Sequence, residues 1–132
     1  MIIRLTLFLS LWLFGCSGNS PCNNVTILTQ HIDGTNLKIV VFQRDCGATT
    51  GFSTQASIIE DSKDLPDETG NVFVADTDHG KAPSGKGGGP ELRVRIIGKG
   101  MIELSYDFRA RVFVNQQEYS GVKISYSTYG AS

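Results

Sequence analysis

The feature that most restricts the fold of this chain is a pair of alternating runs in its C-terminal third. Residues 92–96 place apolar side chains at every second position with arginines between them, and residues 102–106 alternate in the same way. The glycine-bearing segment 98–100 interrupts the apolar pattern between the two runs. Because successive side chains of a strand point to opposite faces, each run predicts a half-buried strand, and the pair predicts a hairpin. Residues 122–126 repeat the alternation.

The rest of the chain also favours strands. Residues 37–43 are rich in β-branched side chains and predict a strand that is covered on both faces. No window shows a sustained apolar repeat of 3.6 residues, although residues 61–67 could hold one helical turn. Shorter strand candidates are residues 54–59, 71–75 and 111–114. We therefore predict an all-β fold, a single small antiparallel sandwich or partly open barrel, without a readable strand order.

The N-terminal residues carry an export signal. Arg4 precedes an apolar run over residues 5–14, and this run is too short to span a bilayer, since a helix that does so needs about 20 residues. Residues 13–16, Leu-Phe-Gly-Cys, resemble the lipobox of bacterial lipoproteins. The resemblance implies lipid attachment at Cys16. The predicted organisation is then a lipoprotein signal peptide (1–15), an N-terminal tether and lead-in (16–34) and a β domain (35–132).

The lipobox also implies a place in the cell. Two or three acyl chains give a durable anchor in the cell envelope, because each buried CH₂ contributes about 0.8 kcal/mol. If the host has two membranes, Ser17 in place of aspartate implies the periplasmic face of the outer membrane. The alternative is ordinary cleavage after Ser17 or Gly18, which predicts a soluble secreted or periplasmic protein.

The cysteines agree with export. The chain has three, and if Cys16 carries lipid, Cys22 and Cys46 remain as an even pair in a compartment where disulfides persist. A disulfide between them would pin the start of the mature domain to the end of the strand over residues 37–43. The alternative, a metal or nucleophilic site, needs partners at ligand spacing, and neither His31 nor His79 supplies one. We predict a structural disulfide, with no metal and no cofactor.

Charge and loop composition argue against two classes of partner. The formal net charge is −1 with acidic and basic residues interspersed, so no basic stripe predicts nucleic-acid binding. Residues 80–86 match G-x-x-x-x-G-K, but Gly-Gly-Gly-Pro follows, which supplies no magnesium-binding hydroxyl and cannot start a helix. We therefore predict no nucleotide site, and interpret residues 82–90 as a mobile surface loop.

Two segments hold the candidate binding residues. The first surrounds the predicted disulfide, where hydroxyl groups and one aromatic ring could form a recognition surface or, alternatively, satisfy backbone groups in a tight connection. The second follows the strand over residues 71–75 and could bind a cation, act in acid–base chemistry or form a solvated turn. Serine catalysis would need a base that the sequence does not place, so no catalytic residue is predicted. The candidates are Thr49, Thr50, Phe52, Ser53 and Gln55 in the first segment, and Asp76, Asp78 and His79 in the second.

The blocks at residues 40–55, 70–76 and 88–90 are similar to a family of small exported bacterial proteins of unknown function. Its most specific part here is Val-Val-Phe-Gln-Arg-Asp-Cys-Gly-Ala-Thr-Thr, and the resemblance implies no activity, substrate or cofactor. We expect a non-enzymatic binding module of the cell envelope that contacts an envelope protein or a cell-wall glycan. The alternative is a small envelope enzyme or enzyme inhibitor in which the two candidate segments meet in one cleft.

Overall fold

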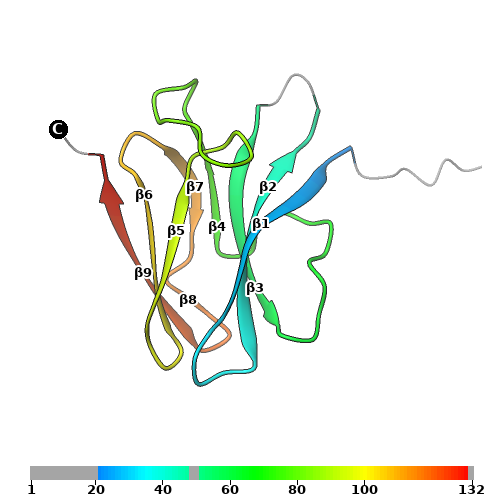
Figure 1. The fold of residues 1–132 in the computed structure, drawn as a ribbon, viewed down its shortest axis with the longest axis vertical. Coiled ribbons are helices and arrows are strands. Elements are labelled where there is room, and N and C mark those ends of the chain that lie inside the picture. Colours follow the sequence, from blue (N-terminus) through cyan, green and yellow to red (C-terminus); the bar gives the residue numbers. More distant parts are fainter. Residues whose placement is uncertain (1–20, 48–50, 131–132) are drawn as a thin grey trace, which may run out of the picture.

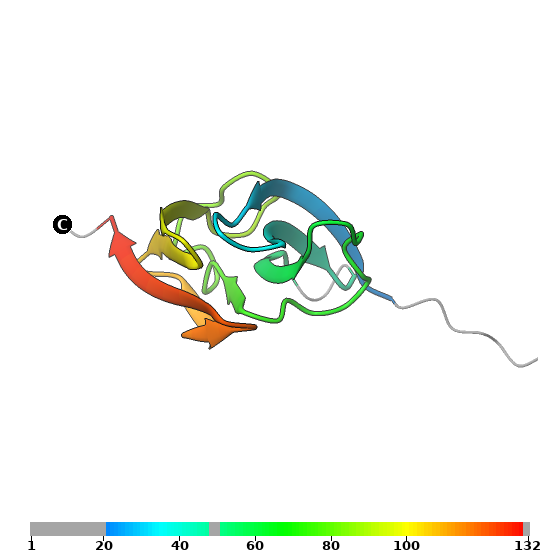
Figure 2. The same ribbon diagram turned by 90° about the horizontal axis from the view of Figure 1, so that it is seen from below.

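The protein is a β sandwich of two sheets, seen in a computed structural model that describes residues 21–47 and 51–130. Within these ranges nine strands and no helix are found, which confirms the all-β prediction, and the open sheet edges make the fold a sandwich rather than a closed barrel (Figures 1 and 2). Accordingly, the described residues include no helix with the length and apolar character that a membrane span requires.

The first sheet has five strands in the order β1-β2-β3-β4-β7, and all its pairs are antiparallel. Its strands β2 and β3 contain the predicted β-branched strand over residues 37–43 and the shorter candidate over residues 54–59, and both lie in the interior of the sheet. The bounds are β1 Asn23–His31, β2 Leu37–Asp45, β3 Ser53–Glu60, β4 Phe73–Asp76 and β7 Arg111–Asn115.

The second sheet has four strands in the order β5-β6-β9-β8. The predicted hairpin is confirmed, since β5 and β6 pair antiparallel with Ile96 opposite Ile102. The pair β6 and β9 is parallel, which departs from the antiparallel expectation. A parallel pair needs a long crossover connection, and here the chain crosses to β7 in the other sheet before it returns. The bounds are β5 Leu92–Gly98, β6 Met101–Asp107, β8 Glu118–Tyr119 and β9 Val122–Tyr129.

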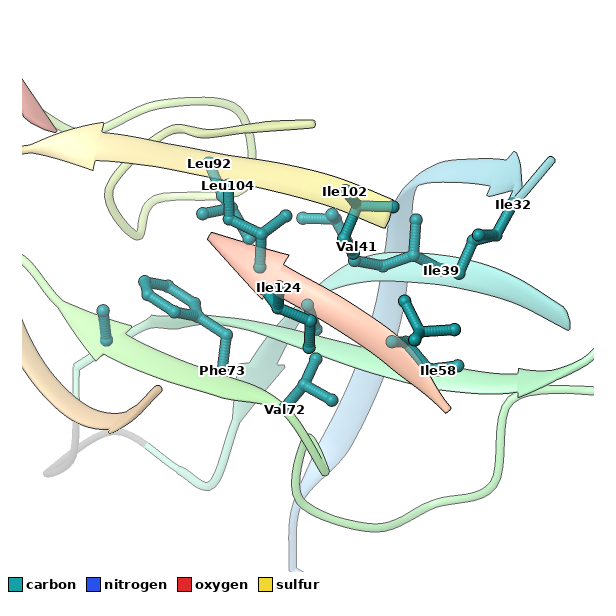
Figure 3. Packing of buried hydrophobic residues seen from close by; sticks show 13 residues of the cluster. Ile32, Ile39, Val41, Ile58, Val72, Phe73, Leu92, Ile102, Leu104 and Ile124 are labelled. Carbon is teal, nitrogen blue, oxygen red and sulfur yellow. The ribbon is translucent and has the colours of Figure 1, made fainter. Parts of the chain in front are cut away.

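The core lies between the two sheets. Figure 3 shows side chains of both sheets, such as Phe73 of the first and Leu104 of the second, pointing into one shared cluster. The Phe73 ring is fully buried and lies 5.4 Å from the ring of Tyr106 and 6.2 Å from that of Tyr126. The alternating residues of β5 and β6 send their apolar side chains into this core, as their pattern predicts.

The predicted disulfide is confirmed. Cys22 precedes β1 and Cys46 follows β2, and the two are bonded across the end of this strand pair, next to the register partners Asn23 and Asp45. The bond closes a loop with a sequence separation of 24 residues. The chain-entropy model gives about 3.5 kcal/mol for a loop of this size.

The outer face of β2 and β3 is covered by the connection to β4, residues 61–71, which forms turns and no helical turn. Phe42 points to this outer face and is nevertheless fully buried. Arg44, also on this face, pairs with Asp67 of the connection at 3.0 Å. Gln55 accepts a hydrogen bond from the backbone N–H of Gly70 at 2.7 Å. Polar side chains of the sheet therefore hold the connection in place.

Residues 82–90 form a loop with an exposed middle, as predicted, and supply nothing to the core cluster, but both ends of the loop are packed against the protein. Ala82 is 1% exposed, and Pro90 is fully buried. The Pro90 carbonyl accepts a hydrogen bond from the hydroxyl of Thr54. At Gly89, a Cβ atom would lie 2.7 Å from the backbone nitrogen of Thr54, so only glycine allows this close approach. The glycines pack the segment against the first sheet instead of leaving it loose.

Candidate functional site

One end of the first sheet brings functional side chains from four strands into a row. Arg44 of β2 pairs in register with Ser53 of β3, Ser53 with Asp76 of β4, and Asp76 with Arg111 of β7. The disulfide lies at the same end, which we call the disulfide end. The connections β4–β5 and β6–β7 also lie there (Figure 1). Segments that are distant in the sequence therefore meet at this end.

The row forms part of an open pocket of about 710 Å³ on the outer side of the first sheet. Phe52 and Phe113 line it with aromatic rings that are 46% and 58% exposed. Ser53, Asp76 and His79 supply polar groups. Further lining comes from Arg44, Cys46, Val74, Thr77 and Arg111. The pocket thus combines flat apolar surfaces with hydrogen-bonding groups, as small-ligand sites do.

An ion pair in the pocket joins the adjacent strands β4 and β7. Arg111 donates from Nε to Oδ1 of Asp76 at 3.1 Å and from Nη2 to Oδ2 at 2.6 Å. Burial alone would raise the pKa of Asp76, but the hydrogen bonds from Arg111 and from the backbone N–H of Asp78, with the attraction of Arg111 and His79, hold that pKa below its ordinary value. The carboxylate is therefore ionised and oriented by its partner, which suits binding better than proton transfer near neutral pH.

The turn after β4 places His79 at the rim of the pocket. Asp78 and His79 have φ values of 51° and 58°, in the left-handed region that non-glycine residues rarely adopt. Asp76 Oδ1 accepts from the N–H of Asp78 at 2.9 Å, and Lys81 pairs with the Asp78 carboxylate at 3.1 Å. These contacts hold the turn, which explains how the unusual backbone conformation is maintained.

The structure brings four of the eight candidate binding residues together in the pocket: Phe52, Ser53, Asp76 and His79. Asp78 lies beside the pocket and pairs with Lys81. Gln55 lies outside it, 5% exposed, and donates to the hydroxyl of Ser53 at 2.9 Å while it holds Gly70. Thr49, Thr50 and the predicted lipid-attachment residue Cys16 lie outside the described residues.

Sequence reasoning missed Arg111 and Phe113. The segment 111–114 was predicted to be a strand, and its side chains alternate as Arg-Val-Phe-Val. The alternation places the arginine and the phenylalanine on the exposed face of the strand, but single exposed apolar side chains are common, so the pattern does not by itself mark a site. In the structure the Arg111 guanidinium lies 5.0 Å from the centre of the Phe113 ring.

The chemistry available in the pocket is that of hydrogen bonding and apolar contact. The Ser53 hydroxyl donates to the Arg44 carbonyl at 3.2 Å and accepts from Gln55, so both partners hold it in the fold. Within the described ranges, no cluster of three or more His, Cys, Asp or Glu side chains could hold a metal ion.

The fold and this pocket define the class of the protein, a two-sheet β sandwich with an open pocket at its disulfide end. Comparison with models of protein families, with curated proteins and with solved structures returned no match.

Proposed function

We propose that the protein is a non-enzymatic binding module of the bacterial cell envelope, which binds an envelope protein or a cell-wall glycan through the pocket at its disulfide end. In this proposal the chain is exported, cleaved and anchored by lipid at Cys16. It belongs to the family of small exported proteins whose blocks it resembles.

One observation carries the proposal. Two segments that the sequence marked independently, at Phe52–Ser53 and at Asp76–His79, line one pocket together with the exposed ring of Phe113. Exposed aromatic rings at a concave surface with a few converging polar groups are the usual composition of a binding site. The charged groups are already paired and oriented, so the surface is organised before any ligand arrives.

The anchor is compatible with this arrangement. A disulfide persists in the oxidising compartments outside the cytosol. Cys16 precedes Cys22 by 22 − 16 = 6 residues. Such a segment reaches at most about 20 Å when extended. A lipid at Cys16 would therefore keep the disulfide end, with its pocket, close to the membrane surface.

Photo-crosslinking in the native host tests the proposed binding surface. A benzophenone amino acid in place of Phe113 should give an adduct with an envelope component. The same substitution at Phe108, which is 49% exposed outside the pocket, should not. The absence of adducts at position 113, or identical adducts at both positions, would contradict the proposal. Mass spectrometry of the same material tests the anchor: we expect an acylated N-terminal Cys16, against an intact Met1 with three free thiols.

A small envelope enzyme or enzyme inhibitor is the second candidate, because Ser53, Asp76 and His79 do share one pocket. As an enzyme, the protein should release soluble fragments from isolated cell walls, and His79→Ala should abolish the release. The matched variant is His31→Ala, since His31 is also exposed and pairs with Asp61 elsewhere. If the unmodified protein releases nothing, the enzymatic form of this candidate falls.

A further inference from the structure

We propose that the ligand of the pocket at the disulfide end is an uncharged saccharide chain; this inference rests on the proposed function as a binding module. Three properties of the pocket carry it: its aromatic surfaces, the pairing of its charges and its position on the sheet.

The aromatic surfaces are flat and exposed. Phe52 and Phe113 belong to different parts of the chain and carry no polar atom; the Arg111 guanidinium lies over the Phe113 ring, so a ligand would contact the exposed remainder of that ring. Gly88 lies so close to Phe52 that a Cβ atom would be 2.6 Å from the ring, and its φ of 93° is one that glycine adopts freely. Gly88 therefore lies against the Phe52 ring. A pyranose ring has an apolar C–H face that matches such a surface, since the face of an aromatic ring is its negative side.

The charges of the pocket are compensated within the protein. Arg111 is bound by two hydrogen bonds to Asp76. Arg44 is 9% exposed and is bound to Asp67 at 3.0 Å and to Asn24 at 2.7 Å. An anionic ligand at either guanidinium would lie close to the carboxylate that already pairs with it, and the repulsion between the two negative charges would oppose binding. A neutral ligand avoids this repulsion. The hydroxyl groups at the edge of a sugar ring can form hydrogen bonds with the polar side chains that line the pocket.

The position of the pocket argues against an extended peptide as ligand. The pocket is lined by the interior strands β2, β3 and β4 and by β7, the edge strand that carries Arg111 and Phe113. A peptide that adds as a strand needs an unpaired sheet edge. A peptide paired with the edge of β7 would lie beside Phe113 and leave Phe52 and Ser53 uncovered, whereas a ligand that fills the whole pocket binds side chains across the strand ends. The volume of about 710 Å³ lies in the range of small-ligand sites.

Calorimetric titration tests the ligand class, with the full chain produced through its own leader and kept in a sugar-free detergent. The probes are chitotetraose, which is N-acetylated, maltotetraose, which is not, and inorganic phosphate. We expect saccharide binding without phosphate binding. Binding of chitotetraose alone would assign the source to N-acetylated cell-wall glycan, and binding of both sugars to neutral polysaccharide in general.

Matched variants locate the binding. Phe113→Ala should weaken saccharide binding about tenfold through the loss of one stacking surface. Phe108→Ala, the same change at an exposed ring outside the pocket, should leave it unchanged. Asp76→Asn removes the charge that compensates Arg111, so this variant should lose affinity for sugar and gain binding of phosphate.

The inference is overturned if neither sugar binds at millimolar concentration, if phosphate binds the unmodified protein, or if Phe113→Ala and Phe108→Ala behave alike. These results are separable from failure of the proposed function. Crosslinks from position 113 to an envelope protein without sugar binding would leave the module intact and remove only the saccharide. Failure of both experiments would remove the module itself.

Discussion

Asp107 is a residue whose ionisation the fold controls closely. It follows directly on the alternating run that forms β6, and its own side chain is nearly inaccessible to solvent. Both carboxylate oxygens accept hydrogen bonds from the Arg109 guanidinium, at 2.9 and 2.8 Å, and Oδ1 accepts another from the backbone N–H of Arg109 at 2.9 Å. The hydrogen bonds from the Arg109 side chain, and next from its backbone, lower the pKa of Asp107 to about 2.

This shift predicts a pH dependence of stability. The unfolded carboxyl has its ordinary pKa of 3.8, so between that value and about pH 2 the unfolded chain binds the proton that the folded protein rejects. The stabilisation by Asp107 is therefore complete above about pH 4 and is lost as the pH falls to about 2. Urea denaturation between pH 2 and pH 5 should show this slope, and Asp107→Asn should reduce it. Arg109→Gln should reduce it as well; an unchanged slope in both variants would contradict the assignment.

Single residues also show how far the site was predictable. Phe52, Ser53, Asp76 and His79 were selected by residue type alone, and the fold brings them into one pocket. Gln55 was selected with them, but its place on the covered face of β3 gives its amide internal partners, and no local pattern reveals that cover. Arg111 reaches Asp76 over a sequence separation of 35 residues. Such a contact depends on strand order, which alternation does not encode.

At the scale of elements, the connection over residues 82–90 agrees with expectation in its exposed middle and differs from it at its packed ends. Its glycines suggested freedom, yet several of them mark places where the backbone touches β2 or β3. Gly87 approaches the side chain of Gln43, and Gly89 approaches the backbone of Thr54. The glycine content of a segment shows which backbone conformations it can adopt. It does not show whether a neighbouring strand lies so close that only glycine fits.

Substitution of Gly89 tests this packing. In Gly89→Ala the new methyl group would lie 2.5 Å from Oγ1 and 2.7 Å from the backbone nitrogen of Thr54, so β3 or the connection must shift. We expect a loss of about 1–3 kcal/mol in the free energy of unfolding, as for other overpacked sites. Gly51→Ala is the matched control, because nothing lies within 4 Å of the added atom there. Equal stability of the two variants in urea would show that the connection is not packed in this way.

The sequence indicated most strands and the β5–β6 hairpin, but it did not indicate β1, which lies in the predicted lead-in, or β8, and it did not indicate the other strand partners. The alternating runs predicted β5, β6 and β9 because one face of each is buried, which is a local property. The parallel pairing of β6 with β9 depends instead on β7 joining the first sheet at β4. The sheet that β7 joins depends on the packing between the two sheets, because the apolar faces of all strands are buried in the same core.

At the scale of the whole molecule, the two sheets are held together by one cluster of apolar side chains. The inner faces of β2, β3 and β4 supply one half of it and those of β5, β6 and β9 the other (Figure 3). No backbone hydrogen-bond ladder joins the two sheets along their described strands, so their association depends chiefly on this burial. The pocket at the disulfide end relies on the first sheet for its row of side chains, and that sheet relies on the second for its buried face.

Phe73 tests whether the two sheets unfold as one unit. Its ring is fully buried in the first sheet and contacts Tyr106 and Tyr126 of the second, so Phe73→Ala should lower the free energy of unfolding by about 3–5 kcal/mol.

All four tyrosines of the chain lie in the second sheet, in β6, β8 and β9. Near-ultraviolet dichroism of tyrosine therefore reports that sheet, while far-ultraviolet dichroism reports both. We expect one coincident transition by both signals, shifted equally by the substitution. Phe113→Ala, at an exposed ring, should shift neither by more than about 0.5 kcal/mol. Separate transitions, with the tyrosine signal unmoved by Phe73→Ala, would mean that the second sheet is stable without the first.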